Sequence, residues 1–220
     1  MNNIKKQLIF MGPPASGKGT QTKMLAEKTG FPHVDTGSLL RASIKNETEL
    51  GKIAKSYIEK GQLAPAELVA SIIKERLLQD DCKNGYILDG YPRSLAQAIM
   101  LDDIMKEINQ GVQTEFKAIC FDIPDEMLLE RIVNRRSCPK CGRIYNTKFL
   151  PPKTEGICDD DGETLTQRKD DTEEVAKMRF ETYYKETEPL IDFYTKRGEL
   201  VRLDATGSTP DIFEKLLKLI

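Results

Sequence analysis

The most constraining feature of this sequence is a glycine-rich loop that joins a short apolar run to a helix-forming stretch. Residues 8–11 (LIFM) are typical of a buried strand, residues 12–20 (GPPASGKGT) form the loop, and residues 18–29 have helical spacing. Glycines let successive backbone N–H groups surround phosphate oxygens, and the N-terminal end of the following helix carries partial positive charge. The loop therefore predicts a phosphate-binding site after the first strand. The alternative is a strand-to-helix turn that binds nothing.

A lysine and a carboxylate near this loop indicate a nucleotide with Mg²⁺. Lys18 stands where a lysine reaches the β and γ phosphates. The hydroxyl residue that usually follows this lysine and meets Mg²⁺ is replaced by Gly19, with Thr20 one step later, so direct metal binding by Thr20 stays open. The apolar run 86–88 ends at Asp89, which either holds Mg²⁺ through water or caps the next turn.

Alternating strand and helix patterns predict the fold class. Further strands are expected at 86–88, 118–121 and 200–203, and helices at 18–29, 38–45, 48–60, 65–79, 95–108, 125–135, 172–195 and 210–219. This order is typical of an α/β protein with βαβ units around a parallel sheet. We expect Pro189 to break or kink the long helix. Residues 137–166 are rich in Pro, Gly, Asp and Cys, which favours a small inserted subdomain.

Composition excludes several classes of protein. A net charge of −2 gives no broad basic surface for nucleic acid. Five cysteines, an odd number, do not fit a secreted disulfide framework, and the apolar run 8–11 is too short for a signal or membrane helix, so we expect a cytoplasmic protein. Arginine, which binds phosphate at two points, is instead concentrated locally. Six of the eleven arginines are Arg131, Arg135, Arg136, Arg143, Arg168 and Arg179.

Three cysteines inside the inserted segment have the spacing of a metal site. The pattern is C-x-x-C, sixteen residues, then C-x-x-D, which matches two knuckles of a zinc ribbon. The predicted ligands of a structural Zn²⁺ are Cys138, Cys141, Cys158 and Asp161. Asp160 is close enough in sequence to compete. The alternatives are a metal-free flexible segment or a redox pair of the first two cysteines. We expect Cys82 and Cys120 to be unligated.

Three further segments carry a family resemblance. They are residues 35–41 (DTGSLLR), 89–97 (DGYPRSLAQ) and 168–171 (RKDD). Together with the loop they closely resemble adenylate kinases, and D-G-[FY]-P-R-x-x-x-Q is specific for nucleoside monophosphate kinases. Residues 122–125 (DIPD) extend the resemblance, which covers essentially the whole chain. The cysteine-bearing segment resembles the zinc-binding lid of long-form bacterial adenylate kinases.

The resemblance implies a fold and a reaction. The fold is a P-loop kinase with a central parallel five-stranded sheet flanked by helices. Its core would comprise residues 1–34, 65–133 and 172–220, with a monophosphate-binding insertion at 35–64 and a lid at 134–171. The reaction is Mg²⁺-dependent and reversible, ATP plus AMP giving two ADP. We expect a monomer that uses these nucleotides without a nucleic acid or membrane partner.

The resemblance also implies site residues. The ATP side comprises Ala15, Ser16, Gly17, Lys18, Gly19, Thr20, Arg135, Ile144, Tyr145 and Gly207. The AMP side comprises Thr36, Arg41, Gln62, Leu63, Ala64, Gly90, Tyr91, Pro92, Arg93, Gln97, Arg168 and Arg179. The catalytic set is Lys18, Asp89, Arg93, Arg131, Arg135, Arg168 and Arg179. We expect Gln97 to contact the adenine edge. The spacing of Arg131 and Arg135 predicts one helical face.

Each of these assignments has a structural alternative. The arginines could be exposed and paired with neighbours such as Glu130 and Glu181. His33 is expected to be structural. Asp170 and Asp171 are expected to orient arginines or to cap the helix that follows.

Rival functions also remain at this point. They are a kinase for another nucleotide, a zinc-ribbon protein that remodels nucleic acid, and a noncatalytic nucleotide sensor. Near-neutral charge and the absence of an aromatic platform beside the cysteines argue against the second. The joint presence of Lys18, Asp89 and Arg93 argues against the third.

Overall fold

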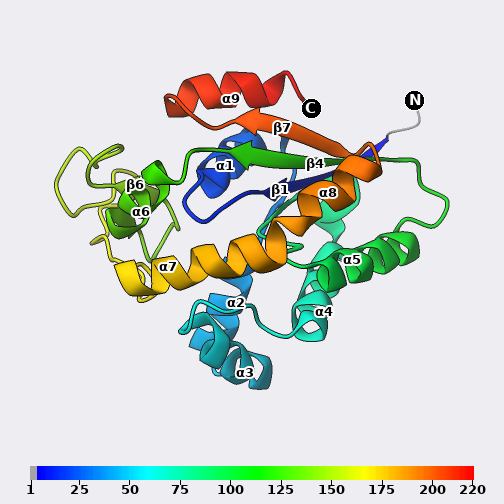
Figure 1. The fold of residues 1–220 in the computed structure, drawn as a ribbon, viewed down its shortest axis with the longest axis horizontal. Helices are drawn as coiled ribbons and strands as arrows, with labels where there is room; N and C mark the ends of the chain where they lie inside the picture. Colours follow the sequence, from blue (N-terminus) through cyan, green and yellow to red (C-terminus); the bar gives the residue numbers. More distant parts are fainter. Residues whose placement is uncertain (1–3) are drawn as a thin grey trace.

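The structure is a computed structural model that describes residues 4–220. Five strands form a parallel sheet at its centre (Figure 1). The strand order is β2-β3-β1-β4-β7. The strands are β1 (Lys5–Met11), β2 (His33–Asp35), β3 (Gly85–Asp89), β4 (Thr114–Asp122) and β7 (Leu200–Asp204). The predicted α/β class and the five-stranded parallel sheet are confirmed. Residues 1–3, which begin the predicted core segment 1–34, lie outside the described residues.

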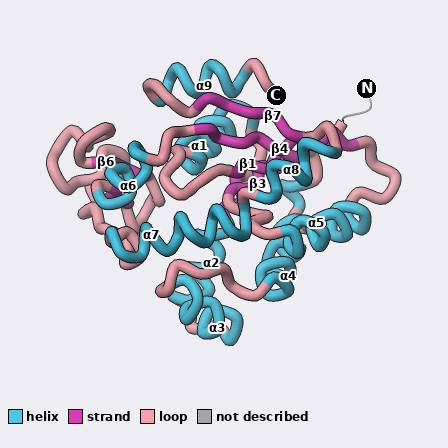
Figure 2. The backbone as a smooth tube through the Cα atoms, viewed as in Figure 1, coloured by secondary structure: helices cyan, strands magenta, loops and turns pink. Residues whose placement is uncertain are grey.

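Helices cover both faces of this sheet (Figures 1 and 2). They are α1 (Lys18–Thr29), α2 (Thr36–Lys45), α3 (Glu49–Ile58), α4 (Ala66–Leu77), α5 (Leu95–Ile108), α6 (Glu126–Val133), α7 (Glu173–Thr182), α8 (Pro189–Lys196) and α9 (Thr209–Leu217), with a 3₁₀ turn at Asp80–Cys82.

Alternate residues of β1 point to opposite faces, as a strand requires. Ile9 and Met11 pack on the side of α4, α5 and α8, whereas Leu8 and Phe10 pack on the side of α1 and α9. Because both faces are covered, the strand reads as a continuous apolar run rather than an alternating one.

The sequence patterns did not predict β2. This edge strand is three residues long, with Val34 as its one fully buried member, so neither alternation nor an apolar run marks it. It pairs with β3 in the register His33↔Ile87 and Asp35↔Asp89. Two polar side chains are thereby placed beside the carboxyl end of β3.

The structure tests the predicted ends of two helices, one at Pro189 and one near Arg135. The predicted break at Pro189 is confirmed: α7 passes into a π-helical turn (Tyr183–Thr187), and α8 begins at the proline. Helix α6 ends at Val133, so the prediction that Arg131 and Arg135 share a helical face is wrong. The reason is that Asn134 caps the helix and Arg135 opens a strand that pairs with Asn146.

Two insertions lie away from the central sheet (Figure 1). One carries α2 and α3. The other carries the antiparallel pair β5 (Arg135–Ser137) and β6 (Ile144–Asn146). In Figure 2 helix α7 runs between these two parts of the chain. Within residues 4–220, no helix has both the length and the apolar character needed to cross a membrane.

Candidate functional site

The glycine-rich loop encloses the ammonium group of its own lysine. Lys18 Nζ donates to the carbonyl oxygens of Gly12 at 2.7 Å and Pro13 at 2.8 Å, and to Ser16 Oγ at 3.0 Å. Burial lowers the pKa of Lys18 to about 8, while nearby Asp89 acts in the opposite direction. None of the described residues offers Lys18 a carboxylate within ion-pair distance. The loop therefore presents an ammonium group that is bonded to neutral oxygens only.

Asp89 lies directly beside this loop. A Cβ atom placed on Gly19 would lie 3.3 Å from Asp89 Oδ2, so the first turn of α1 and the carboxylate are in close approach. His33 Nε2 lies 3.2 Å from the same oxygen. His33 thus holds a site carboxylate, which agrees with the structural role expected for it.

Asp35 is a site residue that sequence reasoning missed. Its Oδ1 accepts the backbone N–H of Gly37 at 2.9 Å and caps α2, and its Oδ2 accepts from Arg41 Nη2 at 3.3 Å. Burial acts to raise the pKa of Asp35, but the Arg41 guanidinium and the Ser38 hydroxyl outweigh it and hold the pKa below its usual value. An acidic residue directly before a helix is a recognised N-cap signal and could have identified this position.

Two arginines of the predicted catalytic set share one buried carboxylate. Arg135 Nε donates to Asp171 Oδ2 at 2.8 Å, and a second, short bond joins Arg135 Nη2 to Oδ1. Arg179 Nη1 lies 3.0 Å from Asp170 Oδ2 and 3.4 Å from Asp171 Oδ1. Asp171 is fully buried. The prediction that these aspartates orient arginines is confirmed, while Thr172 caps α7 instead.

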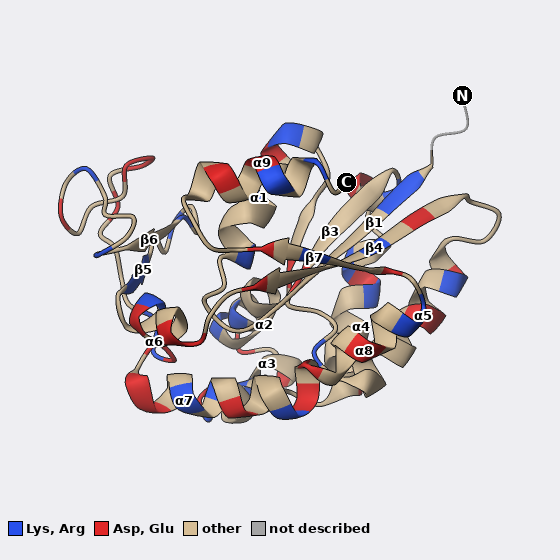
Figure 3. Cartoon of the chain, turned by 45° about the horizontal axis from the view of Figure 1, so that its top comes forward, with Lys and Arg blue, Asp and Glu red and all other residues tan. Residues whose placement is uncertain are grey.

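Other arginines of the set have no carboxylate partner. The half-buried guanidinium group of Arg168 makes no hydrogen bond or ion pair with any residue of the described chain, although its backbone carbonyl accepts the N–H of Asp171 at 3.1 Å. Burial, together with the neighbouring guanidinium groups of Arg135 and Arg41, lowers the pKa of Arg168 to about 10. Burial likewise lowers the pKa of Arg93 and of Arg131. Positive charge is in excess here, as expected of a site for anionic ligands. Figure 3 shows basic residues on β5 and both signs of charge along α7.

The segment after β3 is fixed by its own hydrogen bonds. Gln97 Oε1 accepts the backbone N–H of Arg93 at 2.7 Å, and Arg93 Nε donates to the Gly90 carbonyl at 2.7 Å. The Tyr91–Pro92 peptide bond is cis. Gln97 is buried, and the hydroxyl of Thr36, also buried, has no partner within residues 4–220.

The remaining predicted residues lie on two connecting segments and on β6. Gln62, Leu63 and Ala64 connect α3 to α4. Ile144 and Tyr145 lie on β6, and Gly207 lies between β7 and α9. Glu130, one of the two alternative partners considered for the arginines, pairs with Lys148 instead.

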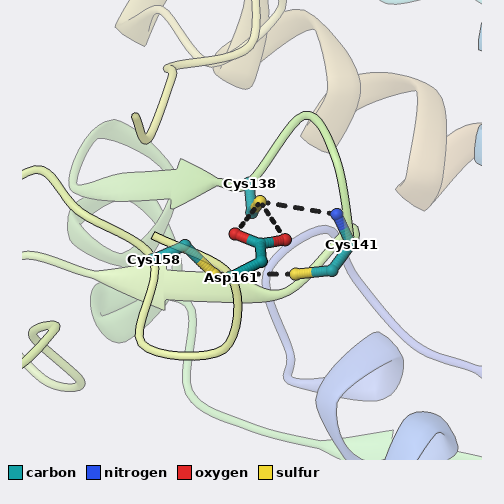
Figure 4. Close-up of side chains that lie close together, drawn as sticks. All are labelled: Cys138, Cys141, Cys158 and Asp161. Atoms are coloured by element: carbon teal, nitrogen blue, oxygen red, sulfur yellow. Dashed lines mark hydrogen bonds between the residues drawn. The ribbon is translucent and has the colours of Figure 1, made fainter. Parts of the chain in front are cut away.

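Cysteines 138, 141 and 158 and Asp161 form a compact group (Figure 4). Their ligand atoms all lie within 4.8 Å of one another. Cys138 Sγ lies 3.4 Å from Asp161 Oδ1, and Cys141 Sγ lies 3.6 Å from Cys158 Sγ. Asp160 pairs with Arg143 outside the group, so Asp161 is the carboxylate that the fold brings to the thiols. Three soft sulfur donors and one carboxylate within tetrahedral reach fit a divalent metal such as Zn²⁺.

Two matching turns build this group. The N–H of Gly142 donates to the Cys138 carbonyl and that of Gly162 to the Cys158 carbonyl, each at 3.0 Å. Burial acts to raise the pKa of Cys158, but hydrogen bonds from the Tyr145 hydroxyl and from backbone N–H groups outweigh it and lower the pKa. The fold thus favours the thiolate form at Cys158, whereas burial and hydrogen bonds within the group raise the pKa of Cys141 to about 12.

Comparisons with known proteins agree with this geometry. A sequence model of the adenylate kinase family matches residues 10–199. The chain is 46% identical over 213 residues to an adenylate kinase of Clostridium tetani, and the match covers 97% of both chains. It is 46% identical over 214 residues to an adenylate kinase of Thermotoga petrophila, covering 97% of this chain and 96% of the relative. An adenylate kinase of Clostridium novyi is 45% identical over 210 residues, with 96% of each chain covered.

This chain belongs to the adenylate kinase family.

The family assignment gives the arginines and the loop a common purpose, because an adenylate kinase must hold two polyanionic nucleotides at once. The family motifs did not indicate which carboxylates pair with the arginines. The Asp171 contact to Arg135 spans 36 positions, so no local pattern could reveal it. The contact of the Tyr145 hydroxyl with Cys158 is likewise visible only in the fold.

We predict that Asp171→Asn destabilises this adenylate kinase strongly. The substitution keeps the size of the side chain but removes the negative charge from two buried guanidinium contacts. Breaking a buried ion pair costs about 3–5 kcal/mol of unfolding free energy. Urea denaturation measures the change.

Asp103→Asn is the matched control, since Asp103 pairs with Lys106 on the exposed surface of α5. Its loss should cost at most about 1 kcal/mol. Equal losses in the two variants would contradict a special role for Asp171.

Proposed function

We propose that this chain catalyses reversible, Mg²⁺-dependent phosphoryl transfer from ATP to AMP, giving two ADP, and so balances the adenine nucleotides. The reaction follows from its membership of the adenylate kinase family. The observation that carries the assignment of residues is Arg168, a half-buried cation with no anionic partner in the described chain, beside Arg41 and Arg135. A phosphate group in transfer is the anion that this position lacks.

The proposed donor site is the loop with the lid arginine. Residues 15–20 would surround the ATP phosphates with backbone N–H groups, and Lys18 would exchange its carbonyl partners for phosphate oxygens. Arg135, Ile144 and Tyr145 would contribute from the lid and Gly207 from the loop after β7. Because the side chain of Tyr145 turns toward Cys158, its backbone is the part assigned to the nucleotide.

The proposed acceptor site takes its residues from α2, from the segment after β3 and from α5. Arg41 and Arg93 would hold the AMP phosphate, and Gln97 would contact the adenine edge. Thr36, residues 62–64 and residues 90–92 would complete this site. Arg131, Arg168 and Arg179 would contact the transferring group from the lid side.

Catalysis by these residues is positioning and charge neutralisation. Phosphoryl transfer has a loose transition state with negative charge spread over the equatorial oxygens, so fixed guanidinium groups stabilise it without a nucleophile or general base. Mg²⁺, when bound with ATP, neutralises charge on the β and γ phosphates. Asp89, held by His33 beside the first turn of α1, is the side chain assigned to it, through water.

The first experiment measures the reaction and its specificity together. Purified protein with ATP and Mg²⁺ is given AMP, UMP, CMP or GMP in turn, and ³¹P NMR follows the phosphate groups. We expect ADP to form with AMP as acceptor. Turnover with another monophosphate in its place would keep the mechanism but overturn the acceptor, and no transfer at all would favour a sensor or remodelling protein.

Arg168→Met tests the residue that carries the assignment. Loss of a preorganised charge at the transition state should lower kcat by about 10²–10³. Arg76→Met is the control, because Arg76 pairs with Asp81 outside the proposed sites and should leave kcat near its original value. A fully active Arg168→Met variant would contradict the proposed role.

We also propose that residues 35–64 and 134–171 close over the nucleotides while the core stays fixed. Closure would exclude water and bring the arginines to both phosphates. Small-angle scattering with and without a bisubstrate inhibitor is expected to show a more compact particle on binding, with the mass of a monomer. Unchanged dimensions would contradict closure.

Structural Zn²⁺ is the proposed occupant of the cysteine group. The lid has few large apolar side chains, so a metal would supply the stability that its small core lacks. All five cysteines are free thiols, which suits the reducing cytoplasm that we propose as the location.

We predict one Zn²⁺ per chain by elemental analysis. Zn²⁺ at about a hundred times its Kd should stabilise the fold by about 2.7 kcal/mol, so a chelator should lower Tm. Cys158→Ser should lose the metal, whereas Cys82→Ser, which changes a buried thiol elsewhere, should retain it. Full metal content in Cys158→Ser would contradict this ligand set.

A further inference from the structure

The hydroxyl of Tyr145 lies within the cysteine group, although tyrosine is not one of its ligands. The side chain comes from β6 and is 1% exposed. Its oxygen accepts the backbone N–H of Asp159 at 2.7 Å and lies 3.4 Å from Cys158 Sγ. The Tyr145 oxygen therefore acts as an acceptor toward Asp159, and its proton is available for donation to the sulfur of Cys158.

Metal binding fixes the direction of this second bond. A cysteine that ligates a metal has lost its proton, so its sulfur can only accept. Tyr145 is then the donor and Cys158 the acceptor. The Tyr145 hydroxyl would then make two hydrogen bonds, one from the Asp159 N–H and one to the Cys158 sulfur, and together they fix its orientation.

The charge of the ligand set explains why a donor is useful here. Three thiolates and a carboxylate bring more negative charge than a divalent cation cancels. Cys138 Sγ accepts the backbone N–H of Cys141 at 3.4 Å, whereas Cys158 receives a side-chain donor. Above the ring of Tyr145, at 4.9 Å from its centroid, lies the guanidinium carbon of Arg143. This guanidinium, which also pairs with Asp160, holds the ring from its face.

We propose that Tyr145 is a positioning residue of the lid metal site, whose hydroxyl donates a hydrogen bond to the metal-bound thiolate of Cys158. The inference rests on the metal site proposed above. The bond from Tyr145 to Cys158 also ties β6 to the metal site, in addition to its contact with α6. Asn146, the next residue, donates from Nδ2 to the carbonyl of Arg131 at 3.0 Å, so the strand is held between the metal ligand and α6.

Tyr145→Phe tests the proposal, because it removes the hydroxyl and keeps the ring. Zn²⁺ affinity is measured by competition with a chromophoric chelator, and the Co²⁺-substituted protein reports the thiolates through sulfur-to-cobalt charge-transfer absorption. Loss of an outer hydrogen bond to a metal ligand typically weakens metal binding about 10–100-fold. We expect that loss, together with a shift of the charge-transfer band to lower energy, since an unbonded thiolate holds its electrons less tightly.

Two further variants separate the hydroxyl from packing. Tyr194→Phe removes a buried hydroxyl that has no partner in the described part of the chain, and should change neither measurement. Tyr145→Leu removes the ring as well. If only Tyr145→Leu weakened metal binding, the contribution of Tyr145 would be packing and the proposal would be wrong.

The remaining outcomes also decide the matter. Wild-type affinity and an unshifted band in Tyr145→Phe would overturn the proposal, as would weaker binding with an unshifted band, because the sulfur would then have lost no donor. Wild-type protein that binds neither metal would refute the metal site itself. That result differs from one in which wild type binds and Tyr145→Phe binds equally.

Discussion

The carboxylate of Asp171 is the anion on which the charged half of this molecule depends. It accepts from Arg135 and lies 3.4 Å from Arg179, and it is fully buried. Around it the fold gathers further guanidinium groups, and burial together with the neighbouring Arg135 guanidinium lowers the pKa values of Arg168 and Arg179 to about 10. Asp171 holds two of these groups in place, with Asp170 also 3.0 Å from Arg179, whereas Arg168 has no carboxylate partner in the described chain. Positive charge is therefore in excess around Asp171, where we propose that the transferring phosphate binds.

The parallel sheet brings that charge to one edge. The loop follows β1, Asp89 ends β3, and Asp35 ends β2, so all three stand at carboxyl ends of neighbouring strands. In open α/β sheets a crevice forms at this edge where the strand order reverses. Here β1 lies between β3 and β4, so the loop that leaves β1 stands where the strand order reverses. A loop, a carboxylate and a helix N-terminus from distant parts of the sequence are thereby brought to the same edge of the sheet.

Much of the fold and of the candidate site could be predicted, because these features follow from local sequence patterns. The loop, the apolar strands, the cysteine spacing and the break at Pro189 each depend on residues close together in the chain. The missed features depend on contacts between distant residues or on very short elements. Strand β2 has a single fully buried residue, and the end of α6 was set by Asn134 and by pairing of Arg135 with Asn146. Likewise the Asp171 and Tyr145 contacts join segments whose distance in space only the fold determines.

Helix α7 has one more consequence. It starts two residues after Asp171, carries Arg179, and ends at Thr182, whose hydroxyl donates to the Gly61 carbonyl at 3.1 Å. The helix therefore sets the distance between the two insertions, because its length depends on its number of residues. Adding or deleting one residue within it would rotate everything beyond that point by about 100° and shift it by about 1.5 Å. The length of α7 is thus set by the two contacts that it joins, at Asp171 and at Gly61.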